Sequence, residues 1–134
     1  DLFPLCELDD IAVIPYNPLA GGLLSGKHSQ SAGPQEGTRF ALGNAAARYQ
    51  ERYWKDQQFQ TVEELRTIAD ESGVGMVELA TAWVLRHPAI TSPIVGASRP
   101  EQLAAPVAAL DIRLDDDVLA RLDDLTRQYS NMDF

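Results

Sequence analysis

IAVIPYNPLAGGLLSGK, residues 11–27, is the stretch that decides the fold. Its first four residues are apolar and largely β-branched, and prolines bound the run, which favours a short parallel strand buried on both faces. A loop of small residues follows, and Asn17 and Pro18 at its start do not suit a central β-ladder. Ligands of α/β folds bind where strands end. We therefore expect the side chains of residues 16–19 to lie at a binding site.

Composition restricts the class of protein. A chain of 134 residues with 45% hydrophobic residues can fill the core of one domain. Twenty acidic residues against eleven basic ones give a net charge of -9, which argues against a nucleic-acid partner. Cys6 is the single cysteine, so an internal disulfide is excluded, and no apolar run approaches the ~20 residues of a membrane span. We expect a cytoplasmic protein without a membrane partner.

A second junction between a strand and a helix lies near the C-terminal end. Residues 90–95, ITSPIV, predict the strand, and GASRPEQ follows it. Ser98 and Glu101 have the spacing of a capping box. A helix start with free amides, a serine hydroxyl and Arg99 is equally a site for an anion. The residues leave both interpretations open: a capped helix, or phosphate contacts at Ser98 and Arg99.

A long segment without apolar periodicity follows the first junction. Residues 28–56 are rich in Ser, Gly, Pro and Gln and predict a mobile surface loop. Arg39 lies within this loop and is either solvated or an anion clamp. Residues 45–54 predict a short helix, whose aromatic side chains we expect to pack rather than to stack on bases.

The remaining helices are predicted from their apolar stripes. Residues 61–72 and 75–86 predict two successive helices. Thr61 and Glu64 have the spacing of a capping box at the start of the first one. Asp115–Asp117 begin the last helix, where carboxylates complement the helix dipole. We assign them this role and no metal site.

The two junctions are expected to meet. Consecutive parallel strands normally lie side by side, so that their C-terminal loops converge. One loop supplies glycines and Lys27, and the other supplies Ser98 and Arg99. Such a pair suits a ligand with several phosphates, as at the C-terminal face of a (β/α)8 barrel. A Rossmann fold fits poorly because the chain has no G-x-G-x-x-G motif.

The motifs VIPYNPLAGGLLSGK, GTRF, VLRHP and ITSPIVGASRPEQL, in this order, resemble the C-terminal portion of the aldo-keto reductases. The resemblance covers nearly the whole chain. It implies an α/β fold, with residues 1–134 as one C-terminal segment that forms the last two βα units and the C-terminal helices of a (β/α)8 TIM barrel. It also implies hydride transfer between NADP(H) and a small-molecule aldehyde or ketone.

The same resemblance implies a role for each residue of the cofactor site. In chain order these are Tyr16 on the nicotinamide ring; Asn17, Pro18, Leu19, Ala20 and Gly21 along the pyrophosphate and ribose; Lys27 and Arg39 over the phosphates; Gly96, Ser98 and Arg99 at the 2′-phosphate; and Gln102 at the adenosine.

Several positions depart from the family pattern. Position 17 is more often Ser than Asn, and Ala105 and Pro106 stand where many members carry Glu and Asn. No segment matches the motifs of the catalytic Asp, Tyr, Lys and His, so no catalytic residue is assigned to this chain. We expect the NADP(H)-binding part of a reductase, a fragment that is inactive alone and that self-associates or assembles with the missing part of the barrel. The alternative is a nonenzymatic cofactor-binding or structural module completed by a partner.

Overall fold

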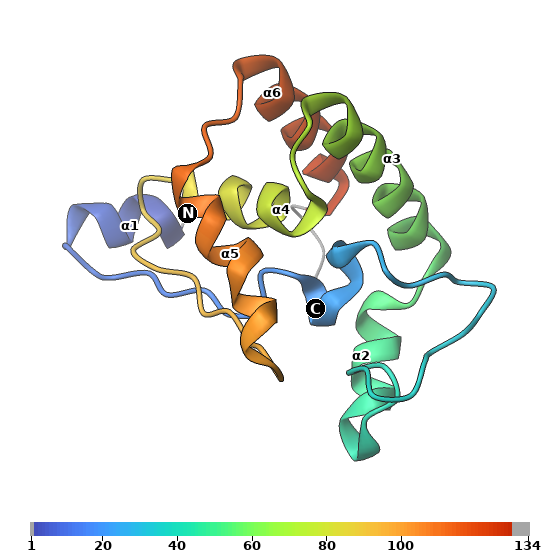
Figure 1. The fold of residues 1–134 in the computed structure, drawn as a ribbon. Coiled ribbons are helices and arrows are strands. Elements are labelled where there is room, and N and C mark those ends of the chain that lie inside the picture. Colours follow the sequence, from blue (N-terminus) through green and yellow to red (C-terminus); the bar gives the residue numbers. More distant parts are fainter. Residues whose placement is uncertain (1, 130–134) are drawn as a thin grey trace.

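The computed structural model describes residues 2–129, and helices dominate this part of the chain (Figure 1). The α-helices are α1 Leu2–Leu8, α2 Ala46–Tyr53, α3 Asp56–Ser72, α4 Met76–Leu85, α5 Ala104–Ala108 and α6 Asp116–Thr126. The 3-10 helices are η1 Ala20–Ser25, η2 Gly43–Ala45, η3 Pro100–Leu103, η4 Ala109–Asp111 and η5 Arg127–Tyr129. Within residues 2–129, none of the helices combines the length and the apolar character that crossing a membrane requires.

The two predicted strands are present only as a pair of isolated parallel bridges. Val13 pairs with Ile90, and Tyr16 pairs with Ile94. The amide of Thr91 donates to the carbonyl of Val13 at 2.9 Å. In return the Val13 amide donates to the Thr91 hydroxyl at 3.1 Å instead of to a backbone carbonyl, which interrupts the ladder. The segments therefore run parallel, as predicted, but the described chain forms no continuous strand from them.

The prediction that residues 11–14 are buried on both faces was wrong for this structure. Ile11 is 52% exposed and Ile14 is 54% exposed, and Ile94 on the partner segment is 55% exposed. A parallel pair becomes buried when further strands flank it and helices cover both faces. Here the paired segments run along one side of the helices, beside α1 and α5 (Figure 1). Their apolar side chains therefore remain in contact with solvent.

Helix α3 connects two hydrophobic clusters. The first lies where α3, α4 and α6 meet and includes Leu79, which is fully buried. The second lies where α3 packs against η1 and the loop before α2, and its centre is the fully buried Phe40. The buried members of the first cluster are Leu65, Ile68, Ala69, Leu79 and Leu122, and those of the second are Leu23, Phe40, Phe59 and Val62.

The predicted start of α3 was wrong, whereas its end was correct. The helix begins at Asp56, and the Thr61 hydroxyl donates to the Gln57 carbonyl at 3.1 Å from inside the helix. Thr61 and Glu64 therefore form no capping box. The helix extends towards the N-terminus because the buried Phe59 joins its apolar face. It ends at Gly73, whose φ of 68° is the left-handed conformation that glycine favours at this position.

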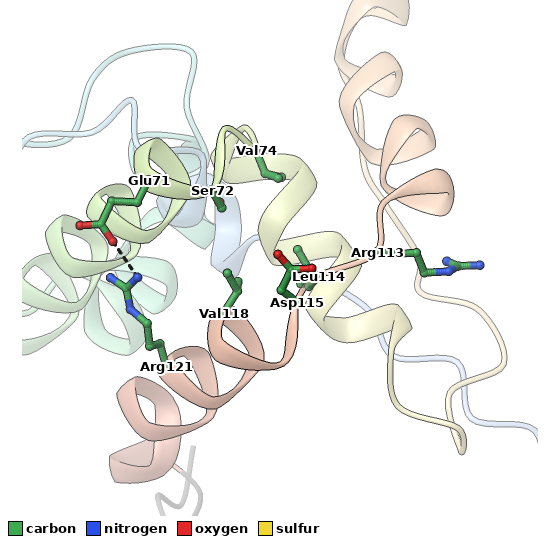
Figure 2. Close-up of a pocket in the computed structure, with 8 residues that line it drawn as sticks. All are labelled: Glu71, Ser72, Val74, Arg113, Leu114, Asp115, Val118 and Arg121. Carbon is green, nitrogen blue, oxygen red and sulfur yellow. Dashed lines mark ion pairs between the residues drawn. The ribbon is translucent and has the colours of Figure 1, made fainter.

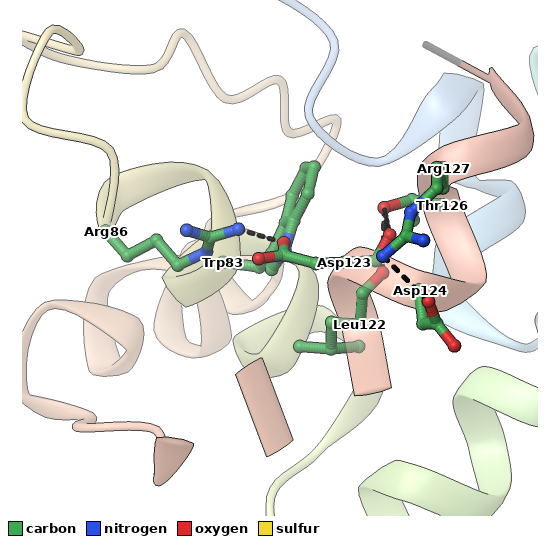
Figure 3. A network of polar contacts seen from close by, with 7 residues as sticks. All are labelled: Trp83, Arg86, Leu122, Asp123, Asp124, Thr126 and Arg127. Atoms are coloured by element: carbon green, nitrogen blue, oxygen red, sulfur yellow. Dashed lines mark hydrogen bonds and ion pairs between the residues drawn. The ribbon is translucent and has the colours of Figure 1, made fainter. Parts of the chain in front are cut away.

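The last helix is connected to α4 by one carboxylate. Asp123 accepts a hydrogen bond from the Trp83 indole nitrogen at 3.0 Å and forms an ion pair with Arg86 (Figure 3). The Arg86 guanidinium lies 5.2 Å from the centroid of the Trp83 ring. Trp83 and the C-cap residue Arg86 at the end of α4 thus present two donors to one acceptor on α6. Exposed ion pairs of this kind add at most about 1 kcal/mol, so the buried cluster contributes more to the packing of α6.

His28 is a buried ring inside the second cluster. It is 5% exposed, and its two ring nitrogens have no hydrogen-bond partner among the described residues. Its ring meets Phe40 and Trp54 edge-on, with centroid distances of 5.0 and 5.6 Å. Desolvation by burial, and next the positive charge of Lys27, lower the pKa of His28 below its ordinary value of 6.5. The imidazole is therefore held neutral in the folded chain.

This lowered pKa predicts a dependence of stability on pH. Below pH 6.5 the unfolded chain binds a proton at His28 that the folded chain does not, so the free energy of unfolding falls as the pH is lowered. The slope between the two pKa values is at most about 1.4 kcal/mol per pH unit. Denaturant unfolding at several pH values measures it. His28→Phe should reduce this slope; a slope equal to that of the unsubstituted chain would contradict the prediction.

Candidate functional site

The first junction ends in a tight turn with left-handed backbone. Asn17, Ala20 and Gly21 have φ angles of 62°, 49° and 71°. The Asn17 side chain stabilises the turn, because its Oδ1 accepts a hydrogen bond from the Gly21 amide at 2.7 Å. Ala20 has no such compensation, and a left-handed alanine costs roughly 1–2 kcal/mol. The turn therefore holds residues 17–21 in a conformation that the surrounding structure must support.

Helix α2 supplies part of that support through two tyrosines on one face. The Asn17 Nδ2 donates to the Tyr53 hydroxyl at 3.0 Å. Tyr49, one turn earlier, lies so close to Gly21 that a Cβ atom there would be 2.7 Å from its ring. Position 21 therefore accepts only glycine, for reasons of both space and φ angle. The turn and α2 are in direct contact.

Arg39 extends from the same tyrosine face towards the second junction. Its Nη1 donates to the Tyr49 hydroxyl at 3.3 Å, and its guanidinium carbon lies 5.7 Å from the centroid of the Tyr49 ring. A Cβ atom on Gly96 would be 3.3 Å from Arg39 Nη2. The structure therefore brings together the turn at Gly21, the loop arginine and Gly96, which are distant in the sequence.

Lys27 lies beside the same turn. A Cβ atom at Gly22 would be 3.9 Å from Lys27 Cε and 4.0 Å from its Nζ, and its nearest neighbour would be His28 Nε2 at 3.8 Å. The Lys27 ammonium group thus lies within van der Waals reach of the position that a side chain at residue 22 would occupy. Residues 27–55 carry five basic and two acidic side chains, in a chain with a net charge of -9. This segment is therefore the electropositive part of an acidic protein.

The second junction does not form the predicted capping box. The Ser98 amide and hydroxyl donate to Gln102 Oε1, at 2.8 and 3.1 Å, and Glu101 takes no part. Helix η3 begins at Pro100, whose ring suits the first helical position, so the N-cap is Arg99. Ser98 thus lies one residue too early to cap the helix with its side chain. Arg99 itself is exposed, with an extended backbone.

Three residues of this region, Tyr49, Arg52 and Tyr53, were not predicted from the sequence as site residues. The aromatic residues of α2 were expected to serve in packing, and no role was assigned to Arg52. The tyrosine hydroxyls of Tyr53 and then Tyr16 raise the pKa of the Arg52 guanidinium, which lies 5.9 Å from the Tyr53 ring centroid. The available signal was the spacing of Tyr49 and Tyr53, because residues four apart share one face of a helix.

The pocket shown in Figure 2 lies elsewhere and contains none of the predicted site residues. Its volume is about 270 Å³, and it is bordered by the end of α3 and the start of α6. An ion pair of 2.6 Å between Arg121 and Glu71 crosses one side of it. Its lining residues are Glu71, Ser72, Val74, Arg113, Leu114, Asp115, Val118 and Arg121. Two of its four acidic or basic lining residues, Glu71 and Arg121, are already paired with each other, so it offers less to a ligand than the turn does.

Comparisons with known proteins agree on one family. The family model described as the aldo/keto reductase family matches residues 1–127. A probable voltage-gated potassium channel subunit beta of Arabidopsis thaliana is 36% identical over 112 residues, 84% of this chain and 34% of that protein. An uncharacterised oxidoreductase of Bacillus subtilis is 33% identical over 126 residues, 93% of this chain and 35% of that protein.

A third relative has a named activity. An L-glyceraldehyde 3-phosphate reductase of Escherichia coli is 31% identical over 110 residues, which cover 82% of this chain and 32% of that protein. The chain thus spans about a third of the length of these relatives. The resemblance read from the motifs is confirmed: with a family model that matches nearly all of its residues, the chain belongs to the aldo/keto reductase family.

Proposed function

We propose that this chain is the NADP(H)-binding C-terminal segment of an aldo/keto reductase that reduces aldehydes or ketones by hydride transfer. The observation that carries the proposal is the position of Arg39, which contacts Tyr49 beside the first junction and approaches Gly96 in the second; one cation near both junctions supports a shared phosphate-bearing ligand. Family membership supports the choice of cofactor. A relative named as a reductase of a phosphorylated aldehyde supports the reaction class.

The residues fit a dinucleotide with several phosphates. The Lys27 Nζ would lie 4.0 Å from a Cβ atom at Gly22, so a positive charge stands beside the turn. Arg39 and Arg99 are exposed guanidinium groups that can each bind a phosphate through two parallel hydrogen bonds. Tyr16 is 72% exposed at the end of its paired segment, which leaves most of its side chain accessible to a flat ring. The bound cofactor would supply the hydride, and these side chains would hold and orient it.

The exposed apolar segments support the proposed barrel. Residues 11–16 and 90–94 already run parallel, and their exposed isoleucines would be covered by the neighbouring strands and helices of a complete (β/α)8 barrel. We propose that they are its last two strands. The catalytic acid and its partners would then come from segments outside residues 1–134, and the 134-residue chain alone would be inactive.

The alternative is a nonenzymatic module that binds the cofactor and needs a partner. It is favoured by the relatives named as voltage-gated potassium channel beta subunits. The test uses the complete natural polypeptide that contains these residues, together with a panel of aldehydes and ketones. We expect this polypeptide to consume NADPH and the isolated 134 residues to consume none. Binding of NADPH without turnover of any carbonyl compound would favour the module, and turnover by the isolated chain would contradict the fragment.

Limited proteolysis gives a second readout of the same proposal. We propose that the polar, largely exposed residues 29–39, between the buried His28 and Phe40, are mobile until the cofactor is bound, because Arg39 reaches the site from this part of the segment. In the complete polypeptide, NADPH should slow cleavage between residues 28 and 42, and NADH should slow it less. Equal cleavage with and without NADPH would remove Arg39 from the site.

A further inference from the structure

We infer that Tyr53 is a positioning residue of the proposed cofactor site, which acts by holding the Asn17 side-chain amide in one orientation. The inference rests on the proposed function. Tyr53 lies on α2, outside the junctions that carry the family motifs, and it makes its contact through its hydroxyl group.

The Asn17 amide makes two hydrogen bonds of opposite kinds. Its Oδ1 accepts from the Gly21 amide at 2.7 Å, while its Nδ2 donates to the Tyr53 hydroxyl at 3.0 Å. If the amide rotated by half a turn, its NH₂ group would face the Gly21 N–H, and two donors would oppose each other. The Gly21 N–H, which can only donate, selects this orientation, and the Tyr53 hydroxyl accepts the hydrogen bond from Nδ2 and so holds the amide in it.

This orientation matters because the turn is conformationally costly. Asn17 and Ala20 both have left-handed backbone angles, and the hydrogen bond from Gly21 closes the turn across them. Without a fixed acceptor at Asn17, the turn can relax to other conformations. The backbone of residues 17–21 would then leave the place in which it approaches the proposed pyrophosphate.

Tyr53 also links the turn to the arginine that reaches the second junction. Its ring centroid lies 6.1 Å from that of Tyr49, whose hydroxyl accepts from Arg39. The same helix face therefore fixes the turn on one side and Arg39 on the other. A shift of the turn away from α2 would also remove the close contact between Gly21 and Tyr49. We expect cofactor affinity, and not the chemical step, to depend on the Tyr53 hydroxyl.

The test compares Tyr53→Phe in two backgrounds of the complete polypeptide, with NADPH as the titrated probe in calorimetry. In the wild-type background, Tyr53→Phe should weaken NADPH binding by about three- to tenfold, since a neutral hydrogen bond contributes about that factor. In the Asn17→Ser background the same change should alter Kd by less than twofold, because the shorter side chain has no amide for Tyr53 to hold. This non-additivity separates a role through Asn17 from one through the neighbouring Arg52.

The matched control is Tyr129→Phe. Tyr129 also uses its hydroxyl in a hydrogen bond, to Thr61 at 2.6 Å, but at the contact between η5 and α3. This control should leave the Kd for NADPH within twofold of the wild-type value. Under turnover, Tyr53→Phe should raise the KM for NADPH and leave kcat within twofold. Equal losses in both Asn17 backgrounds, or an unchanged Kd, would overturn the inference.

Two further outcomes are distinguishable. A wild-type polypeptide that binds neither NADPH nor NADH would overturn the proposed function, and the inference with it. If Tyr53→Phe does not fold, the Asn17→Ser variant alone tests the inference. Serine retains an oxygen beside the turn, but it is too short to contact the Tyr53 hydroxyl. We expect this variant to weaken the binding of NADPH by the same factor of about three to ten. An affinity equal to that of the wild type would overturn the role of the pair.

Discussion

Replacing Phe40 by alanine is expected to lower the free energy of unfolding by about 3–5 kcal/mol. The Phe40 side chain is 0% exposed, and its ring meets those of Trp54 and His28 with centroid distances of 4.8 and 5.0 Å. Alanine would remove the contacts of the whole ring and leave a cavity that this aromatic cluster can fill only in part. Denaturant unfolding, followed by tryptophan fluorescence, measures the change, because Trp54 is a direct neighbour.

The control for this prediction lies two residues further along. Leu42 is also large and apolar, but it is 61% exposed, so Leu42→Ala should change the stability by less than about 0.5 kcal/mol. Phe40 belongs to residues 28–42, which the sequence assigned wholly to a surface loop. A loss below about 1 kcal/mol for Phe40→Ala would mean that the loop is not anchored in the core by this residue.

Local signals predicted several element boundaries correctly. Gly73 and Gly75 were recognised as the end of α3 and the start of α4, and the structure shows a left-handed glycine at one and an N-cap at the other. Asp115 was recognised as the start of the last helix and is its N-cap. These assignments succeeded because glycine conformation and helix capping depend on residues within one turn.

Capping boxes were predicted less well, because a spacing does not show which of two side chains will take the contact. At Ser98 the partner is Gln102 and not Glu101. At Thr61 the predicted cap lies within a helix, because burial of Phe59 favours five further helical residues. In both cases packing outweighed a local preference.

The contacts that form the candidate site could not be read from periodicity. Asn17 meets Tyr53, and Arg39 meets Gly96, across 36 and 57 positions of sequence. Such pairs are set by tertiary packing of α2 on the turn, for which a single sequence carries no signal. The family resemblance identified Asn17 of the first pair and both members of the second, with the chemistry expected of them. The burial of the paired segments also depends on neighbours, which explains why two apolar runs are exposed in this chain.

Arg99→Ala is expected to weaken the binding of NADPH to the complete polypeptide by about ten- to a hundredfold, with little change for NADH. The two cofactors differ by the 2′-phosphate, which NADH lacks. A hydrogen bond to a charged group contributes roughly 1.5–3 kcal/mol, and about 1.4 kcal/mol corresponds to a factor of ten in affinity. The exposure of Arg99 at the start of η3 places the expected loss towards tenfold, since solvent screens the pair.

The structure also supplies the comparison that makes this prediction specific. Arg113 is another exposed arginine, but it borders the pocket near α6 and not the second junction. Arg113→Ala removes the same charge from the protein, so it reports any loss that comes from the overall field alone. Calorimetric titration of both variants with both cofactors separates the effects. If Arg99 is a solvated residue, Arg99→Ala will reduce the affinity for NADPH less than twofold, as Arg113→Ala does. If Arg99 contacts the part that both cofactors share, the affinities for NADPH and NADH will fall equally. Only a loss confined to NADPH and to Arg99→Ala is consistent with a contact between this guanidinium and the 2′-phosphate.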